Sequence, residues 1–148
     1  MRPLHFVLLV LLCIVLSAGT ATADEPSDLQ RVNGPWVPES IVFNGQALPA
    51  ELLQKIKVEL SDGNYVATVD QAIERGTFTF DESKSPKEMD VTITAGPRKN
   101  NTILAIYKLD GDKSTVCYGA TDGQRPMSFA APAGSQFMLI EYRRPANE

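Results

Sequence analysis

Four polar side chains in the second half of the chain could bind a ligand or exchange protons: Lys87, Asp90, Tyr107 and Arg125. A guanidinium can hold a carboxylate or a phosphate by two parallel hydrogen bonds, and the other three groups can act as acids or bases. No spacing among them matches a catalytic arrangement, so we assign no catalytic residue. Two interpretations stay open, a salt-bridge cluster that ties strand ends together or a cluster that anchors a ligand at a barrel mouth.

The neighbours of these groups predict how they pair. Asp90 has the opposite parity from Met89 and Val91, so it should face away from their side of the strand. We expect Lys87 to pair with Asp90 or to cap the strand entry. We expect the guanidinium of Arg125 to bind backbone carbonyls or Asp90.

Cys117 is the fifth candidate, because it lies between two other small residues on one strand face. Thr115, Cys117 and Gly119 leave room on that face. Bulky neighbours such as Phe78 fill it, or a cavity remains for a ligand. The thiol itself is either buried and inert or paired with another molecule.

The inventory of histidine and cysteine excludes several kinds of site. The one histidine, His5, and the other cysteine, Cys13, both lie in the first 23 residues. Without them, the rest of the chain cannot build a histidine-based triad, a His/Cys zinc site, a c-type haem attachment or an internal disulfide. We therefore expect no metal and no cofactor.

The N-terminus predicts export. Arg2 precedes an apolar run from 6 to 16, and Ala21 and Ala23 frame a cleavage site, so we assign residues 1–23 as a signal peptide. We expect a periplasmic or extracellular protein with no membrane insertion, since no later segment reaches the about 20 apolar residues of a spanning helix. The net charge of −4 argues against nucleic-acid binding.

The rest of the chain predicts an all-β domain over residues 34–145, after a lead-in segment at 24–33 in which 28–31 could form one helical turn. Short alternating segments joined by Gly, Asp and Asn turns predict an eight-stranded antiparallel barrel, mostly up-and-down. Met127–Ala131 and Phe137–Arg143 are its last segments. One helix is expected over Leu48–Ile56, covering the strand Thr102–Leu109, which is apolar on both faces.

The tripeptide Gly34-Pro35-Trp36 precedes the first strand, which is predicted from Trp36 to Phe43, and Arg143-Arg144 ends the last one. This arrangement resembles the lipocalin superfamily. The resemblance implies that an arginine lies over the indole and closes the barrel floor, and we assign Trp36 and Arg143 to that role. An indole face is the best partner for a guanidinium, so the pairing also makes physical sense.

A longer resemblance covers nearly the whole chain after residue 23, to a small exported domain family of uncharacterised function in Planctomycetes. It implies a domain and a compartment but no reaction. The matching stretches are Gly34-Pro35-Trp36, Gly76-Thr77-Phe78, Pro86-Lys87-Glu88-Met89-Asp90, Ala105-Ile106-Tyr107, Gly111-Asp112, Cys117, Arg125-Pro126 and Leu139 to Arg144.

Three functions follow from these observations. The first is a lipocalin-like barrel that binds a small apolar or amphipathic molecule, for which we require a cavity above about 300 Å³. The second is a structural or protein-interaction domain of the cell envelope with a filled barrel and an exposed apolar patch. The third, an enzyme that uses Asp90, Lys87, Tyr107 and Arg125, has no supporting spacing.

Overall fold

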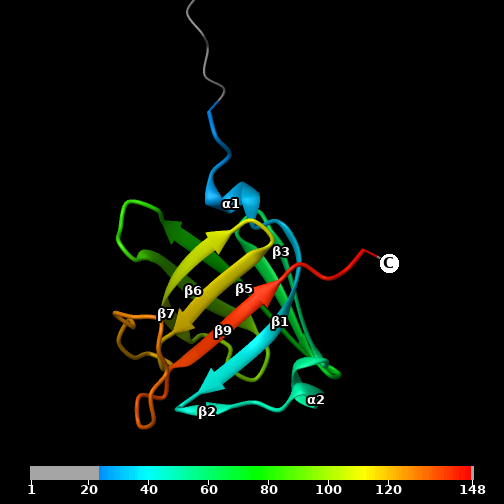
Figure 1. Cartoon of the computed structure of the whole chain (residues 1–148), viewed down its shortest axis with the longest axis vertical. Coiled ribbons are helices and arrows are strands. Elements are labelled where there is room, and N and C mark those ends of the chain that lie inside the picture. The colour runs from blue at the N-terminus through cyan, green and yellow to red at the C-terminus, as the bar shows by residue number, and fades with distance from the viewer. Residues whose placement is uncertain (1–23, 148) are drawn as a thin grey trace, which may run out of the picture.

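The computed structural model describes residues 24–147, which form one antiparallel sheet closed into a barrel (Figure 1). The predicted signal peptide, residues 1–23 with His5 and Cys13, lies outside the described residues. The strands are β1 (Gly34–Phe43), β2 (Gln46–Ala47), β3 (Ile56–Ser61), β4 (Asn64–Val69), β5 (Ala72–Asp81), β6 (Lys87–Ala95), β7 (Thr102–Asp110), β8 (Lys113–Tyr118) and β9 (Met138–Arg143). The helices are α1 (Asp28–Arg31) and α2 (Ala50–Leu53).

The eight-stranded up-and-down barrel predicted from the sequence is confirmed. The order is β1-β3-β4-β5-β6-β7-β8-β9, each strand pairs antiparallel with the next, and β9 pairs back to β1. The two-residue strand β2 is an addition that pairs only with the end of β1. Closure leaves the eight main strands without a free edge.

The predicted strand Met127–Ala131 is wrong. These residues belong to an irregular loop over residues 119–137 that connects β8 to β9. Both edges of β8 are already paired, to β7 and to β9, so the closed barrel offers the segment no partner. The loop instead covers the outside of β7, where Ile106 is buried.

The predicted helix Leu48–Ile56 is longer than the observed α2, and it does not cover β7. The backbone amide of Leu48 donates to the carbonyl of Ile41 in β1, and Ile56 already pairs with Val69 in the sheet. Only one helical turn remains between these two attachments. α2 packs against β1 at the rim of the barrel.

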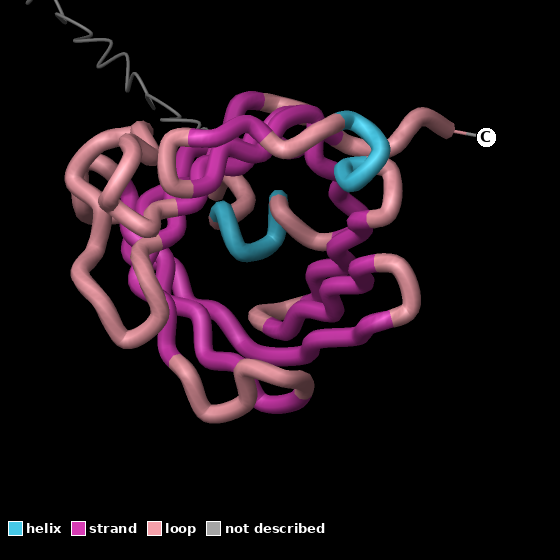
Figure 2. The backbone as a smooth tube through the Cα atoms, turned by 90° about the horizontal axis from the view of Figure 1, so that it is seen from below, coloured by secondary structure: helices cyan, strands magenta, loops and turns pink. Residues whose placement is uncertain are grey.

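The strands run between two differently built ends. The α1 end carries α1 and the turns after β3, β5 and β7, and the α2 end carries α2, the turns after β4 and β6 and the loop 119–137. Seen from the α2 end, the tube of strands surrounds α1, which crosses the far end (Figure 2). Within residues 24–147, no helix has the length and apolarity to cross a membrane.

Candidate binding site inside the barrel

The barrel encloses a cavity of about 250 Å³. Its wall is made of inward-facing side chains from the eight main strands, which alternate with exposed residues because the side-chain period of a strand is two. Most are apolar, among them Ile41, Val58, Phe78, Val91, Ile103 and Ile140. The barrel is therefore not filled with side chains, although a filled barrel was expected for a structural or protein-interaction domain.

The volume limits what the cavity could hold. It lies below the about 300 Å³ that we required for the first function, so that criterion is not met, and the cavity is too small for a drug-sized ligand. It exceeds the roughly 150 Å³ of an apolar cavity known to hold one benzene molecule. Val69, which lines the cavity at the α2 end, is 50% exposed, so the cavity meets solvent there.

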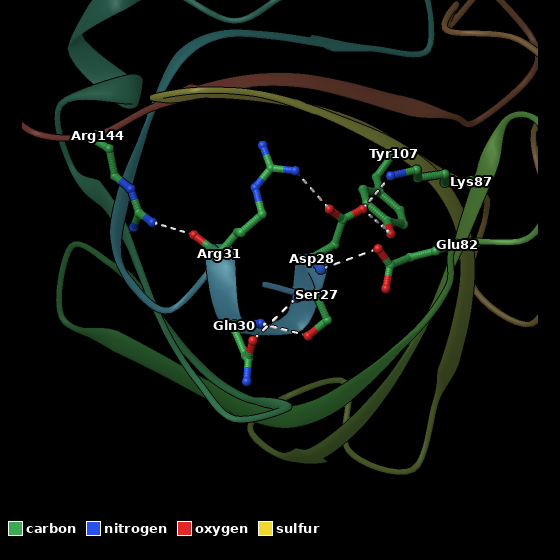
Figure 3. A network of polar contacts seen from close by, with 8 residues as sticks. All are labelled: Ser27, Asp28, Gln30, Arg31, Glu82, Lys87, Tyr107 and Arg144. Carbon is green, nitrogen blue, oxygen red and sulfur yellow. Dashed lines mark hydrogen bonds and ion pairs between the residues drawn. The ribbon is translucent and has the colours of Figure 1, made fainter. Parts of the chain in front are cut away.

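The α1 end is closed by a helix whose acidic side chain is buried inside the barrel (Figure 3). Asp28 is 1% exposed. Its Oδ2 accepts from Lys87 Nζ at 2.6 Å and from the hydroxyl of Tyr107 at 2.9 Å, and its Oδ1 accepts from Arg31 Nη1 at 3.2 Å. The backbone amide of Asp28 donates to Glu82. Three elements, α1, β6 and β7, thus meet at one carboxylate.

These contacts decide the protonation of the group. Burial raises the pKa of Asp28, but the hydrogen bonds from Lys87 and Tyr107 and the charges of Lys87 and Arg31 outweigh it and hold the pKa below its usual range. Burial and the neighbouring Asp28 raise the pKa of Tyr107. At pH 7 the carboxylate of Asp28 is therefore charged and the phenol of Tyr107 is neutral. The phenol can then donate its hydrogen to the carboxylate, which satisfies both buried groups.

Local sequence explains why so short a helix forms here. Ser27 and Gln30 make a capping box, in which the Gln30 amide donates to Ser27 Oγ and the Ser27 amide donates to Gln30 Oε1. The predicted helical turn is confirmed. The segment 24–33, expected to be a lead-in outside the barrel, instead supplies the buried Asp28 and Val32.

The arginine that lies over the indole is Arg144, so our choice of Arg143 is wrong. The Cζ atom of Arg144 lies 3.9 Å from the centre of the Trp36 ring, and its guanidinium donates to the carbonyls of Pro35 and Arg31. Arg143 lies on the outer face of β9, 3.8 Å from Glu39. Side chains along a strand alternate between the two faces. Ile140 and Tyr142 face inward, and Arg144 continues this series just after β9, whereas Arg143 does not.

Arg144→Ala should therefore lower the free energy of unfolding by about 1–2 kcal/mol, through loss of the cation–π contact and two charged hydrogen bonds. Arg143→Ala, which removes an exposed ion pair, should change it by less than about 0.5 kcal/mol. Urea unfolding followed by the fluorescence of Trp36, the single tryptophan, measures both. Equal losses in the two variants would contradict the assignment.

A second polar group lies in the wall near the α2 end. Arg98 forms two hydrogen bonds of 2.9 Å with Glu74, and the hydroxyl of Tyr65 donates to Glu74 at 3.0 Å. All three line the cavity. Burial, together with the charge of Glu74, raises the pKa of Tyr65. The carboxylate of Glu74 neutralises the guanidinium of Arg98 through their two hydrogen bonds.

A pair of tyrosines forms the third polar feature of the wall. The hydroxyls of Tyr118 on β8 and Tyr142 on β9 lie 3.1 Å apart, and both side chains line the cavity. Burial raises the pKa of each hydroxyl. Both therefore keep their hydrogens at neutral pH.

The five predicted site residues do not form one site. Lys87 and Tyr107 meet at Asp28 inside the α1 end, so the predicted pairing of Lys87 with Asp90 is wrong. Lys87 shares the inward parity of Met89, whereas Asp90 faces outward as predicted. Its partner there is Arg125, at 2.6 Å.

Arg125 fastens the loop 119–137 to the outside of the barrel. Its guanidinium donates to the carbonyls of Met89 and Ala105 and pairs with Asp90, which confirms the expected contacts. Its Nε lies 3.6 Å from Glu88. Of our two interpretations, this arrangement corresponds to the structural salt-bridge cluster, because none of these polar side chains lines the cavity.

Cys117 does not line the cavity either. It pairs in register with Ile106 and Leu139 on the outer face, is fully buried beneath the loop 119–137, and its thiol donates to the carbonyl of Ala130. The idea that the Thr115, Cys117 and Gly119 face opens into the interior is therefore wrong. Burial raises the pKa of the thiol, which makes it a poor nucleophile.

Labelling of Cys117 should report opening of this loop. In Arg125→Ala, we expect a disulfide-exchange reagent to label the thiol roughly 10 to 100 times faster under native conditions, because three charged hydrogen bonds that hold the loop are lost. Arg143→Ala, on another face, should label at the wild-type rate. An unchanged rate in Arg125→Ala would show that the loop is held in another way.

Sequence reasoning missed most of the cavity's polar residues. The inward parity of Tyr65, Glu74 and Tyr142 could have been read from their strands. Asp28 had no such signal, because its burial depends on where the segment before β1 crosses the barrel.

Comparison with known proteins assigns no family. No protein-family model matches the chain, and no curated protein matches it. A solved structure of a DUF4847 family protein from Bacteroides vulgatus is 12% identical, with 80% of this chain and 96% of that chain covered and a TM-score of 0.49. At these values the similarity does not indicate a relationship. The resemblances to lipocalins and to the Planctomycetes domain family stay predictions.

Proposed function

We propose that this protein, after export, binds a small apolar or amphipathic molecule inside its barrel. The observation that carries the proposal is the apolar cavity of about 250 Å³ in a barrel whose α1 end is sealed. Transfer of apolar surface from water into such a cavity is favourable by about 25 cal/mol per Å². The volume restricts the ligand to a molecule somewhat larger than benzene.

The surface around the α2 end supports entry there. Four of the large apolar side chains that remain exposed lie at this end, with exposed fractions of 45–50%. They are Phe43 at the end of β1, Leu52 in α2, Val69 at the end of β4 and Ile73 near the start of β5. An apolar rim lowers the cost of moving an apolar molecule from water toward the cavity.

A matched pair of alanine substitutions tests the proposal. Ala67 lines the cavity, whereas Ala72, on the neighbouring strand, is exposed. With α-methylstyrene as the probe, we expect saturable changes in the NMR signals of cavity residues in the wild type and in Ala72→Leu, and loss of binding in Ala67→Leu because the new side chain occupies the cavity. No saturable binding in the wild type, or unchanged binding in Ala67→Leu, would overturn the proposal.

A further inference from the structure

The pair of Tyr118 and Tyr142 contains one hydroxyl hydrogen more than its contacts use. Two phenols carry two hydrogens, and the contact of 3.1 Å between them uses one, whichever phenol donates. Within residues 24–147, neither hydroxyl bonds to any other group. One O–H is therefore left to point elsewhere.

The surroundings of this hydrogen are the cavity. Both rings belong to the cavity wall, with Val116, Met138 and Ile140 on the same strands. None of these three side chains offers a strong acceptor, and the polar groups that affect the pKa values of the pair from nearby, Tyr65, Glu74 and Arg98, bond to one another. An apolar occupant that shields this O–H from water without accepting from it costs free energy comparable to a lost hydrogen bond, so the pair favours an occupant that supplies an acceptor.

The charges of the wall set a second condition. Within the described residues, the charged side chains that line the cavity are Glu74 and Arg98, and these two neutralise each other through a bidentate contact. The hydroxyl of Tyr65 is already donated to Glu74. A charged ligand head would therefore be buried without an unpaired opposite charge, which is costly.

We propose that the Tyr118–Tyr142 pair recognises the polar end of the ligand, and that this ligand is an uncharged apolar molecule of about eight to ten carbons with one hydrogen-bond acceptor, such as a ketone, an ester or an ether. The inference rests on the proposed function and names its ligand class. The two hydroxyls are kept protonated by burial and so remain available to donate.

A matched pair of probes separates this inference from the proposed function. Acetophenone and α-methylstyrene have nearly the same shape, and they differ in that a carbonyl oxygen replaces a methylene group. In Tyr118→Phe/Tyr142→Phe we expect acetophenone to bind roughly three to ten times more weakly than to the wild type, since one neutral hydrogen bond is lost. The affinity for α-methylstyrene should not fall.

The single variants add a sharper expectation. Each of Tyr118→Phe and Tyr142→Phe leaves one hydroxyl whose hydrogen is not used within the protein, so each should keep most of the affinity for acetophenone. α-Methylstyrene is the control in each variant, because it has no oxygen that could accept the hydrogen bond. NMR titration measures the affinities, and the spectrum of each variant verifies that it is folded.

Each outcome supports or overturns a defined statement. Binding of neither probe by the wild type overturns the proposed function and the inference with it. Binding of both probes, with acetophenone affinity unchanged in the double variant, overturns the inference and leaves the proposed function standing. If the double variant does not fold, the single variants decide, because tenfold weaker acetophenone binding in each would also contradict the inference.

Discussion

Asp28→Ala is expected to lower the free energy of unfolding by about 2–4 kcal/mol and to loosen the α1 end of the barrel. The substitution removes the acceptor shared by Lys87, Tyr107 and Arg31 and leaves the buried hydroxyl of Tyr107 without a partner. Loss of one member of a buried ion pair costs about 3–5 kcal/mol. We expect less than the upper limit, because the Lys87 side chain is 39% exposed and can turn to water.

Urea unfolding of three variants measures the effect. Tyr107→Phe removes one hydrogen bond and keeps the ion pairs, so its loss should be smaller, about 1 kcal/mol. Leu29→Ala, beside Asp28 but 36% exposed, serves as a control for changes to α1 itself. If Asp28→Ala were no worse than Leu29→Ala, α1 would not be held by its carboxylate.

The pKa of Asp28 adds a pH dependence of known sign. The pKa in the folded protein is below that of the unfolded chain, so the group stabilises the fold fully above about pH 4. This contribution disappears as the pH falls through the lower, folded pKa. Between pH 7 and pH 2 the wild type should therefore lose more stability than Asp28→Asn does.

Gly76→Ala is expected to destabilise the barrel by about 2–4 kcal/mol, or to prevent folding. A Cβ atom at position 76 would lie 2.5 Å from Cε1 of Tyr65 and closer still to the carbonyl oxygen of Thr92. Since one of these neighbours is backbone in the adjacent strand, it cannot move without breaking sheet pairing. Overpacking of a well-packed core costs about 1–3 kcal/mol and sometimes more.

The same substitution should disturb the polar group near the α2 end. The ring of Tyr65 lies over Gly76, and its hydroxyl reaches Glu74 from that position. Displacement of the ring should change the NMR signals of Glu74 and Arg98 in any folded fraction. Gly111→Asn is the control, because no atom lies within 4 Å of its added Cβ and asparagine tolerates the positive φ of 58°. If the Gly76→Ala protein were as stable as the wild type, the ring of Tyr65 would have to adopt another position without cost.

The tyrosine pair and the Asp28 group are two polar sites of opposite kind in the barrel. At the α1 end, the carboxylate of Asp28 accepts hydrogen bonds from Lys87, Tyr107 and Arg31, as is typical of a structural closure. In the cavity wall, one hydroxyl hydrogen is left for an occupant. This difference separates residues that hold the barrel together from residues that we expect to contact a ligand.

Local patterns in the sequence determined the eight main strands, most of their turns and the parity of side chains along each strand. Asp90 was predicted to face away from Met89 from its position alone, and the closed order of eight strands followed from short turns between alternating segments. The period of two is a property of the extended backbone, so it can be read one strand at a time.

Tertiary structure alone decided which face of each strand lies inside the barrel. It also decided which side chains from distant parts of the chain come into contact there. Thr115, Cys117 and Gly119 share a face by parity, but β8 is covered on both sides, inside by the barrel and outside by the loop 119–137, so composition could not distinguish the two. The same limit applies to Asp28 with Lys87 and to Arg144 with Trp36, since these partners are brought together only when the barrel closes. The volume of the cavity depends on all eight strands at once, because it is the space that their side chains leave after closure.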